Sequence, residues 1–385
     1  MQKEQKKVAI FKFLVKIFLL GRKFLLNVPS SNQIEKFKQI LYYFFMTSTA
    51  DLSVNSYKKF SEHIGMFCHS TNIGVLNTED SIYLIDTGTC AEDAKNLLAS
   101  LNQIFPGKKV KEIFNTHSHS DHCGGNSYIV EKTNCTVNAP YLESLIMQFP
   151  YLMGAMYWGA YPFESLKVQN FVNQTANKVD RIFWQQEQNC QGTQESWQQK
   201  QQKQILLKSP QKIELGELCI EIVSLPGHYF DQVGFLVSDK SENKKAFFLG
   251  DGFFGIPLLK RFWIPFIYEP EDFRKSIEKI EEIFADFYIP GHGDVCTNEN
   301  LEAVAEFNII VTLEFEKLIK KLLLKNPQNQ EELLKSVADY AGLELKESNY
   351  ILIGTTLRSY LSSMNRRGIL EHKIVENRLI WSVAV

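Results

Sequence analysis

Between residues 115 and 125 the chain reads Asn-Thr-His-Ser-His-Ser-Asp-His-Cys-Gly-Gly, which places three histidines and an aspartate within six positions. Polar groups crowded this tightly are costly to bury unless something unites them. A divalent cation does so, and imidazole together with carboxylate suits zinc, manganese or iron. Alternate positions of an extended loop project to one side, so His117, His119 and Asp121 can converge on one point. His122, at the start of the next predicted helix, can turn toward a second ion.

Three further motifs supply partners for this loop. Each directly follows a strand-like apolar run, and loops at strand ends can meet in space. The motifs are Leu225-Pro-Gly-His228, Phe247-Phe-Leu-Gly-Asp251 and Ile289-Pro-Gly-His292. A lone histidine is more often a hydrogen-bonded core residue than a ligand, but a metal site accounts for all of these motifs together. The predicted metal ligands are His117, His119, Asp121, His122, His228, Asp251 and His292.

In order and spacing these motifs resemble those of the metallo-β-lactamase-fold hydrolases, over roughly residues 60–300. Asp86, in Leu84-Ile-Asp-Thr-Gly-Thr89, matches that family's first motif, whose aspartate orients the metal loop instead of binding metal. The resemblance implies an α+β fold of four layers, αββα. It also implies two ions, expected to be Zn²⁺, with Fe or Mn as alternatives. One ion would be held by His117, His119 and His228, the other by Asp121, His122 and His292, and both by Asp251 as a bridge.

The same resemblance implies a hydrolase that activates a bridging water, since metal ions lower the pKa of bound water toward neutrality. Asp121 would orient the nucleophile or carry its proton, and Asp86 would fix a histidine ligand. We expect an acyl substrate, namely an ester, thioester or lactone. Two alternatives stay open: a metal-dependent nuclease or phosphodiesterase, and a mononuclear iron enzyme resembling the persulfide dioxygenases. Two positions disfavour known activities of the family. Diiron flavoproteins have Glu in place of His119, which disfavours an oxygen-reducing diiron centre. The best-known true β-lactamases have Cys in place of Asp251, which disfavours antibiotic hydrolysis as the native role.

Substrate-binding residues are harder to predict. Two aromatic runs, residues 149–163 and 253–268, follow metal motifs and either line an apolar pocket or belong to the core. The candidates for substrate contact are Tyr229, Lys260 and Arg261.

Composition divides the chain into three parts. Residues 1–50 form a predicted basic, amphipathic helical extension, with nine Lys and Arg against two Glu. Within it, residues 8–28 suit a helix that lies on a membrane surface or packs on the protein body. Residues 51–300 form the predicted catalytic domain, in which residues 141–205 are an aromatic and Gln-rich insertion. Residues 301–385 predict three helices and a hairpin, a winged-helix-like domain whose layout resembles that of lactamase-β-like protein 2, a single-strand RNA endonuclease.

Charge and cysteine content indicate partners and location. Residues 301–385 carry eleven basic and eleven acidic side chains, so packing, homodimerisation or covering of the active site is favoured over nucleic-acid binding by this part. The expected partner is a small-molecule substrate. The seven cysteines form no CxxC pair, as is typical of reduced intracellular thiols. We therefore expect a cytoplasmic protein, with membrane association through residues 8–28 as the open alternative.

Overall fold

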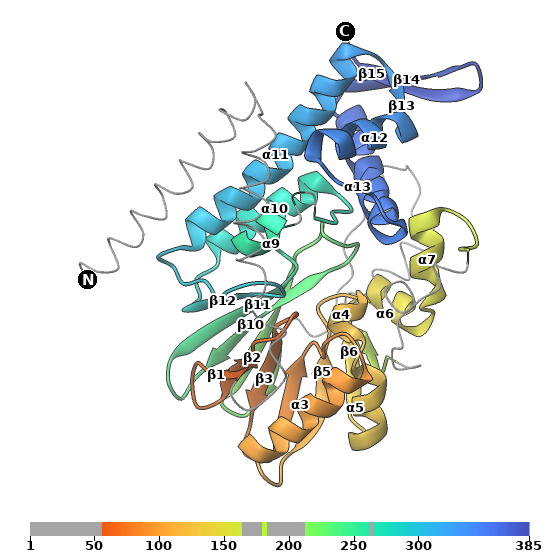
Figure 1. Ribbon diagram of the computed structural model, residues 1–385. Coiled ribbons are helices and arrows are strands. Elements are labelled where there is room, and N and C mark those ends of the chain that lie inside the picture. Colours follow the sequence, from red (N-terminus) through yellow and green to blue (C-terminus); the bar gives the residue numbers. More distant parts are fainter. Residues whose placement is uncertain (1–55, 164–178, 183–211, 262, 264, 385) are drawn as a thin grey trace, which may run out of the picture.

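The computed structural model describes residues 56–163, 179–182, 212–261, 263 and 265–384 (Figure 1). The predicted N-terminal extension, including residues 8–28, and the Gln-rich tract of residues 185–204 lie outside these ranges. Within the described ranges, no helix combines the length and the apolarity that a membrane span requires.

Two sheets form the centre of the molecule. Among the described residues, the first sheet has seven strands in sequence order: β1 Tyr57–Lys59, β2 Ile64–Phe67, β3 Ile73–Asn77, β4 Ser81–Ile85, β5 Lys109–Phe114, β6 Thr136–Ala139 and β7 Arg181–Ile182. The second has the order β12-β11-β10-β9-β8, built from β8 Lys212–Leu215, β9 Leu218–Ser224, β10 Val233–Asp239, β11 Lys244–Gly250 and β12 Phe287–Pro290. In the first sheet β4 to β7 run parallel, whereas β1 to β4 form an antiparallel meander.

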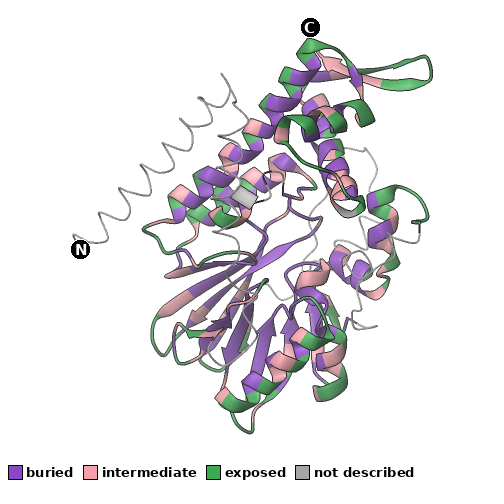
Figure 2. Cartoon of the chain, in the orientation of Figure 1, coloured by how far each residue is buried: buried purple, intermediate pink, exposed green. Residues whose placement is uncertain are grey.

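The two sheets pack against each other through side chains that alternate along the strands. On β4, Tyr83 and Ile85 share a buried cluster with Phe235 of β10, between the two sheets. The intervening residues, Ile82 and Leu84, pack instead under helices α3 (Ala91–Ile104) and α5 (Asn126–Thr133). Because successive side chains of a strand point to opposite faces, each sheet buries both sides. Figure 2 shows the strands coloured as buried along most of their length.

Helices cover the outer face of the second sheet. Its outward side chains join one continuous apolar cluster with the helices that follow: α9 Ile256–Arg261, α10 Pro270–Glu282, α11 Leu301–Lys325, α12 Gln330–Ala341 and α13 Glu347–Arg366. Helix, sheet, sheet and helix layers are therefore present, and the predicted four-layer αββα architecture is confirmed (Figure 1).

The C-terminal part continues this outer layer. After α11 come a short strand, α12, α13 and a hairpin, and the strands make a small sheet of order β13-β15-β14, with β13 Gln328–Asn329, β14 Leu370–Val375 and β15 Arg378–Val383. The predicted three helices and hairpin are present, whereas their winged-helix-like arrangement stays a prediction. The further resemblance to lactamase-β-like protein 2 stays a prediction, as do the domain boundaries.

A buried ion network ties this part to the body. Glu316 on α11 accepts hydrogen bonds from Arg274 on α10 at 2.9 Å and from Arg367, just after α13, at 2.7 Å. The side chains of Arg274 and Glu316 are 13% and 10% exposed, so the network is shielded from water. One carboxylate thus joins three helices.

The aromatic run that follows the metal loop forms a helical hairpin. It comprises α6 Tyr141–Gln148 and α7 Tyr151–Trp158, each preceded by a proline, and Gly159 ends α7 with a φ of 79°. Proline is favoured at a helix start, and a left-handed residue ends a helix most easily when it is glycine. The hairpin places α7 beside α13 (Figure 1).

Candidate metal centre

The predicted ligands meet because their motifs all follow strand ends. The loop from Asn115 follows β5 and leads into the short helix α4 (Ser120–Cys123). In the second sheet β9, β11 and β12 run in one direction, since β10 is antiparallel to β9 and β11 while β11 is parallel to β12. Their carboxyl ends therefore lie at one edge, where His228, Asp251 and His292 follow them.

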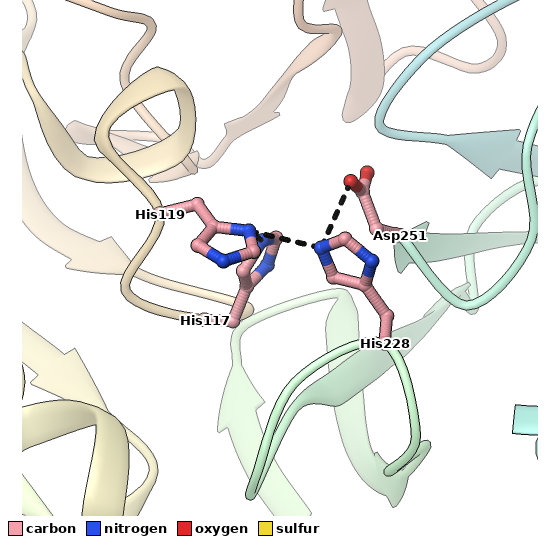
Figure 3. Close-up of side chains that lie close together, drawn as sticks. All are labelled: His117, His119, His228 and Asp251. Atoms are coloured by element: carbon pink, nitrogen blue, oxygen red, sulfur yellow. Dashed lines mark hydrogen bonds and ion pairs between the residues drawn. The ribbon is translucent and has the colours of Figure 1, made fainter. Parts of the chain in front are cut away.

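One group of donor atoms comprises His117, His119, His228 and Asp251 (Figure 3). The Nδ1 atom of His119 lies 3.0 Å from Nε2 of His117 and 2.9 Å from Nε2 of His228. The Oδ2 atom of Asp251 lies 3.3 Å from the same nitrogen of His228. Three ring nitrogens and a carboxylate oxygen thus face a common point.

A second group adjoins the first and comprises Asp121, His122 and His292. The Nε2 atom of His292 is 3.0 Å from Oδ2 of Asp121, and Nε2 of His122 is 3.9 Å from that oxygen. Asp251 connects the groups, because its Oδ1 lies 3.3 Å from Nε2 of His122 while its Oδ2 faces His228. All seven predicted ligands are brought together, in the two sets that the resemblance implied.

Hydrogen bonding within the chain leaves this cluster unsatisfied. Nδ1 of His119 faces two ring nitrogens, yet an imidazole nitrogen carries at most one proton. Among the described residues, the buried Nε2 of His122 and Oδ1 of Asp251 have no hydrogen-bond partner. Such orphaned atoms are rare in native interiors unless an ion or water completes them. The donor set therefore fits divalent cations.

The outward nitrogens of three histidines are held by oxygen acceptors. His122 donates from Nδ1 to Oδ2 of Asp86 at 2.7 Å. His228 donates from Nδ1 to the carbonyl of Phe266 at 2.9 Å, and His292 does so to the carbonyl of Ser70 at 2.7 Å. Because these oxygens only accept, each Nδ1 carries a proton, and Nε2 is the ring atom that faces the centre. Partners of this kind fix the tautomer and orientation of metal-binding histidines.

Asp86 has the contacts that the predicted supporting role requires. It is buried and occupies the left-handed region with a φ of 62°. Its carboxylate accepts from the backbone N–H of Thr116 at 2.9 Å and from the hydroxyl of Thr116 at 2.8 Å, in addition to His122. The hydroxyl oxygen of Thr116 lies 3.0 Å from Nδ1 of His117 and accepts from it, since its own proton goes to Asp86. One carboxylate thereby orients two histidines.

The electrostatics differ between the donors. Burial lowers the pKa of His122 and of His292, but the nearby carboxylates outweigh burial, so the pKa of His122 lies above its ordinary value and that of His292 is about 9, and a bound cation would displace a proton from each ring. Burial, aided by the neighbouring His228, lowers the pKa of His119 to about 3, and burial with the adjacent histidines also lowers the pKa of His117. Both rings are therefore neutral at pH 7 and keep a free lone pair. Burial raises the pKa of Asp251, but the surrounding histidines outweigh burial and hold it below its ordinary value, so Asp251 is ionised.

Of the three predicted substrate-contact residues, the structure describes the side chain of Tyr229 alone. Tyr229 is completely buried, with its ring centroid 4.3 Å from that of His119, so it supports the histidine from behind. Lys260 and Arg261 lie in α9, and their side chains are outside the described part of the structure. Aromatic rings do border the centre, since Phe254 and Phe266 lie 5.4 and 5.8 Å from His228.

Sequence reasoning missed two residues at the site. The hydroxyl of Tyr157 lies 2.9 Å from Nε2 of His119. Glu143, buried on α6, accepts from the backbone and hydroxyl of Ser118, between two ligands, at 3.0 and 2.6 Å. Both belong to the aromatic and Gln-rich insertion that the sequence indicated only as a whole.

Comparison with known proteins gives the fold. Residues 66–184 match the family model of the Metallo-beta-lactamase superfamily. A beta-lactamase domain protein from Burkholderia ambifaria is similar in structure, with a TM-score of 0.60, 13% identity, and coverage of 89% of this chain and 96% of that one. A metallo-beta-lactamase family protein from Thermus thermophilus has a TM-score of 0.56, 15% identity, and coverage of 81% and 93%. No curated protein matches the sequence. Together these findings show that the chain has the metallo-β-lactamase fold, within which residues 66–184 match the superfamily's model.

Proposed function

We propose that this protein is a metallohydrolase that uses two divalent cations, expected to be Zn²⁺, to hydrolyse an acyl substrate such as an ester, thioester or lactone. The observation that carries the proposal is the pair of adjoining donor groups with Asp251 between them. His117, His119 and His228 would hold one ion, Asp121, His122 and His292 the other. When bound, such ions lower the pKa of water and polarise the substrate carbonyl.

The open side of the centre lies at Asp121. Its side chain is 35% exposed and that of His292 is 16% exposed, whereas His122 is 0% and Asp251 is 5% exposed. Substrate and water would therefore approach across Asp121, which would orient the attacking water or carry its proton. Thr71 donates to Oδ2 of Asp121 at 3.4 Å, which leaves Oδ1 for that task.

The walls favour an acyl group over a phosphodiester. Phe266, Phe230 and Tyr157 pack together beside His119, and residues 144–163 contain no Lys, Arg or Asp. A nucleic-acid substrate would need cationic side chains to neutralise its phosphates, and residues 144–163 contribute none. An apolar acyl chain would instead gain from burial against the aromatic rings.

The test is a metal-dependent substrate panel. Chelator-treated protein is reloaded with Zn²⁺, Mn²⁺ or Fe²⁺ and assayed with nitrophenyl esters, thioesters and lactones of increasing acyl length, and with bis-nitrophenyl phosphate. We expect acyl hydrolysis that needs metal, a kcat/KM that rises with acyl length, and loss of turnover in His119→Ala. His372→Ala, on β14 and remote from the centre, is the matched control. Preferred phosphodiester cleavage, or iron-dependent oxygen uptake with a persulfide and no hydrolysis, would contradict the proposal.

A further inference from the structure

Tyr157 connects the metal loop to the next structural layer. Because Nδ1 of His119 faces the other donors, its Nε2 carries the proton and donates to the hydroxyl oxygen of Tyr157, 2.9 Å away. The tyrosine is 4% exposed, and its neutral hydroxyl has oxygen lone pairs that can accept a hydrogen bond. Its ring packs 5.3 Å from Phe266, whose carbonyl accepts from His228.

The backbone of Tyr157 is held from the C-terminal part of the chain. Tyr157 lies in the last turn of α7, where carbonyl groups lack partners within the helix. Arg358 on α13 donates to that carbonyl at 2.9 Å, and the Thr355 hydroxyl lies 3.3 Å from it. A cation at a helix C-terminus also interacts favourably with the helix dipole. Ile351, one turn before Thr355 on α13, joins Tyr157 and Tyr229 in one buried cluster.

These contacts form a continuous connection from α13 to the metal centre. Helix α13 fixes the end of α7, the end of α7 fixes the phenol, and the phenol fixes the ring of His119. We propose that the C-terminal unit completes the metal centre through this route, with Tyr157 as a positioning residue for His119 and Arg358 as its anchor. The inference rests on the proposed function, in which His119 is a metal ligand.

The test measures metal affinity of the full chain with Co²⁺ as the only probe, by competition with a chromogenic chelator. Tyr157→Phe keeps the ring and removes the acceptor, so we expect Co²⁺ affinity to fall by about 10- to 100-fold, the usual effect of losing a ligand's supporting partner. Arg358→Met should act in the same direction but less strongly, because Arg358 is exposed and Thr355 remains. Arg378→Met is the matched control, since this arginine lies on β15 and pairs with Glu376.

Two readouts separate positioning from general stability. A merely structural role would lower the Tm of the metal-free protein and leave Co²⁺ affinity unchanged. Positioning predicts weaker Co²⁺ binding together with a changed ¹⁵N signal of the His119 ring in the metal-free protein, which reports its tautomer. Wild-type Co²⁺ affinity in both Tyr157→Phe and Arg358→Met would overturn the inference. Hydrolysis has no part in these readouts, so a chain that binds Co²⁺ but cleaves no acyl substrate contradicts the proposed function alone.

Discussion

Gly291 offers a sharp test of the site geometry, because it touches the donors without being one of them. A Cβ at this position would lie 2.5 Å from Oδ1 of Asp251 and 2.6 Å from Cε1 of His122. The backbone cannot retreat easily, since the Gly291 N–H donates to the carbonyl of Gly250 at 2.6 Å and its carbonyl accepts from Asn72 at 2.7 Å. In Gly291→Ala the two donor side chains must therefore move.

The size of the movement follows from these contacts. Real Cβ atoms essentially never approach a neighbour closer than 3.0 Å, so Asp251 must shift by at least about 0.5 Å and His122 by at least about 0.4 Å. A misplacement of about 1 Å at a reacting centre can cost roughly 100-fold in rate. We expect kcat/KM to fall by about 10- to 100-fold, which corresponds to about 1.4 to 2.8 kcal/mol.

The assay pairs this variant with Gly354→Ala. Gly354 lies inside α13, where a Cβ would meet only Leu334 at 3.5 Å, an ordinary contact. Alanine is favoured over glycine in a helix interior by about 1 kcal/mol, so this control should keep activity and gain stability. Metal affinity, kcat/KM and Tm are measured for both variants. A Gly291→Ala protein with wild-type metal affinity and turnover would refute the geometry.

Three further predictions concern stability. Glu316→Ala removes the carboxylate that two partly buried arginines share, and Arg367 keeps only Glu271, at 3.7 Å, as an acidic partner. The free energy of unfolding in urea should therefore fall by about 2 kcal/mol, and a change below about 0.5 kcal/mol would contradict the network. Burial raises the pKa of Asp239, but hydrogen bonds from Ser241 and Ser61 outweigh it and hold the pKa below its ordinary value. Its carboxylate therefore adds stability that is complete above about pH 4 and is lost as the pH falls through the folded pKa, and urea melts from about pH 2 to 7 should show this acid limb reduced in Asp239→Asn. Asn329 caps α12 by accepting from the backbone of Glu332, and Asn329→Ala should cost about 1 kcal/mol in thermal melts.

The sequence predicted regular elements where their period was clear. The apolar stripe of residues 91–104 gave the bounds of α3, because a 3.6-residue repeat over fourteen residues has few alternative interpretations. The strand-like run Lys212–Ile222 was less clear and is two strands, since Gly216, with a φ of 63°, turns the chain between β8 and β9. A single glycine within a run of alternating apolar and polar residues is only weak evidence in the sequence for a turn.

The donors of the centre and one support, Asp86, were predictable from the sequence, whereas the other supports were not. Histidines and aspartates are seldom grouped directly after apolar strand-like runs, so each ligand motif could be recognised in the sequence. The acceptors of His228 and His292 are backbone carbonyls, which any residue type provides. Tyr157 is one of many aromatic residues in its run, and only the packing of α7 against the metal loop singles it out.

The most direct test of the whole account is metal stoichiometry. Purified full-length protein is loaded with Zn²⁺, passed through a desalting column and analysed for metal by mass spectrometry. We predict two ions per chain and fewer than two in His119→Ala. In that variant the group that contains His119 loses a donor, and only the group of Asp121, His122 and His292 keeps all of its donors. A wild-type chain that retains no metal, or a His119→Ala chain that retains both ions, would contradict the proposed centre.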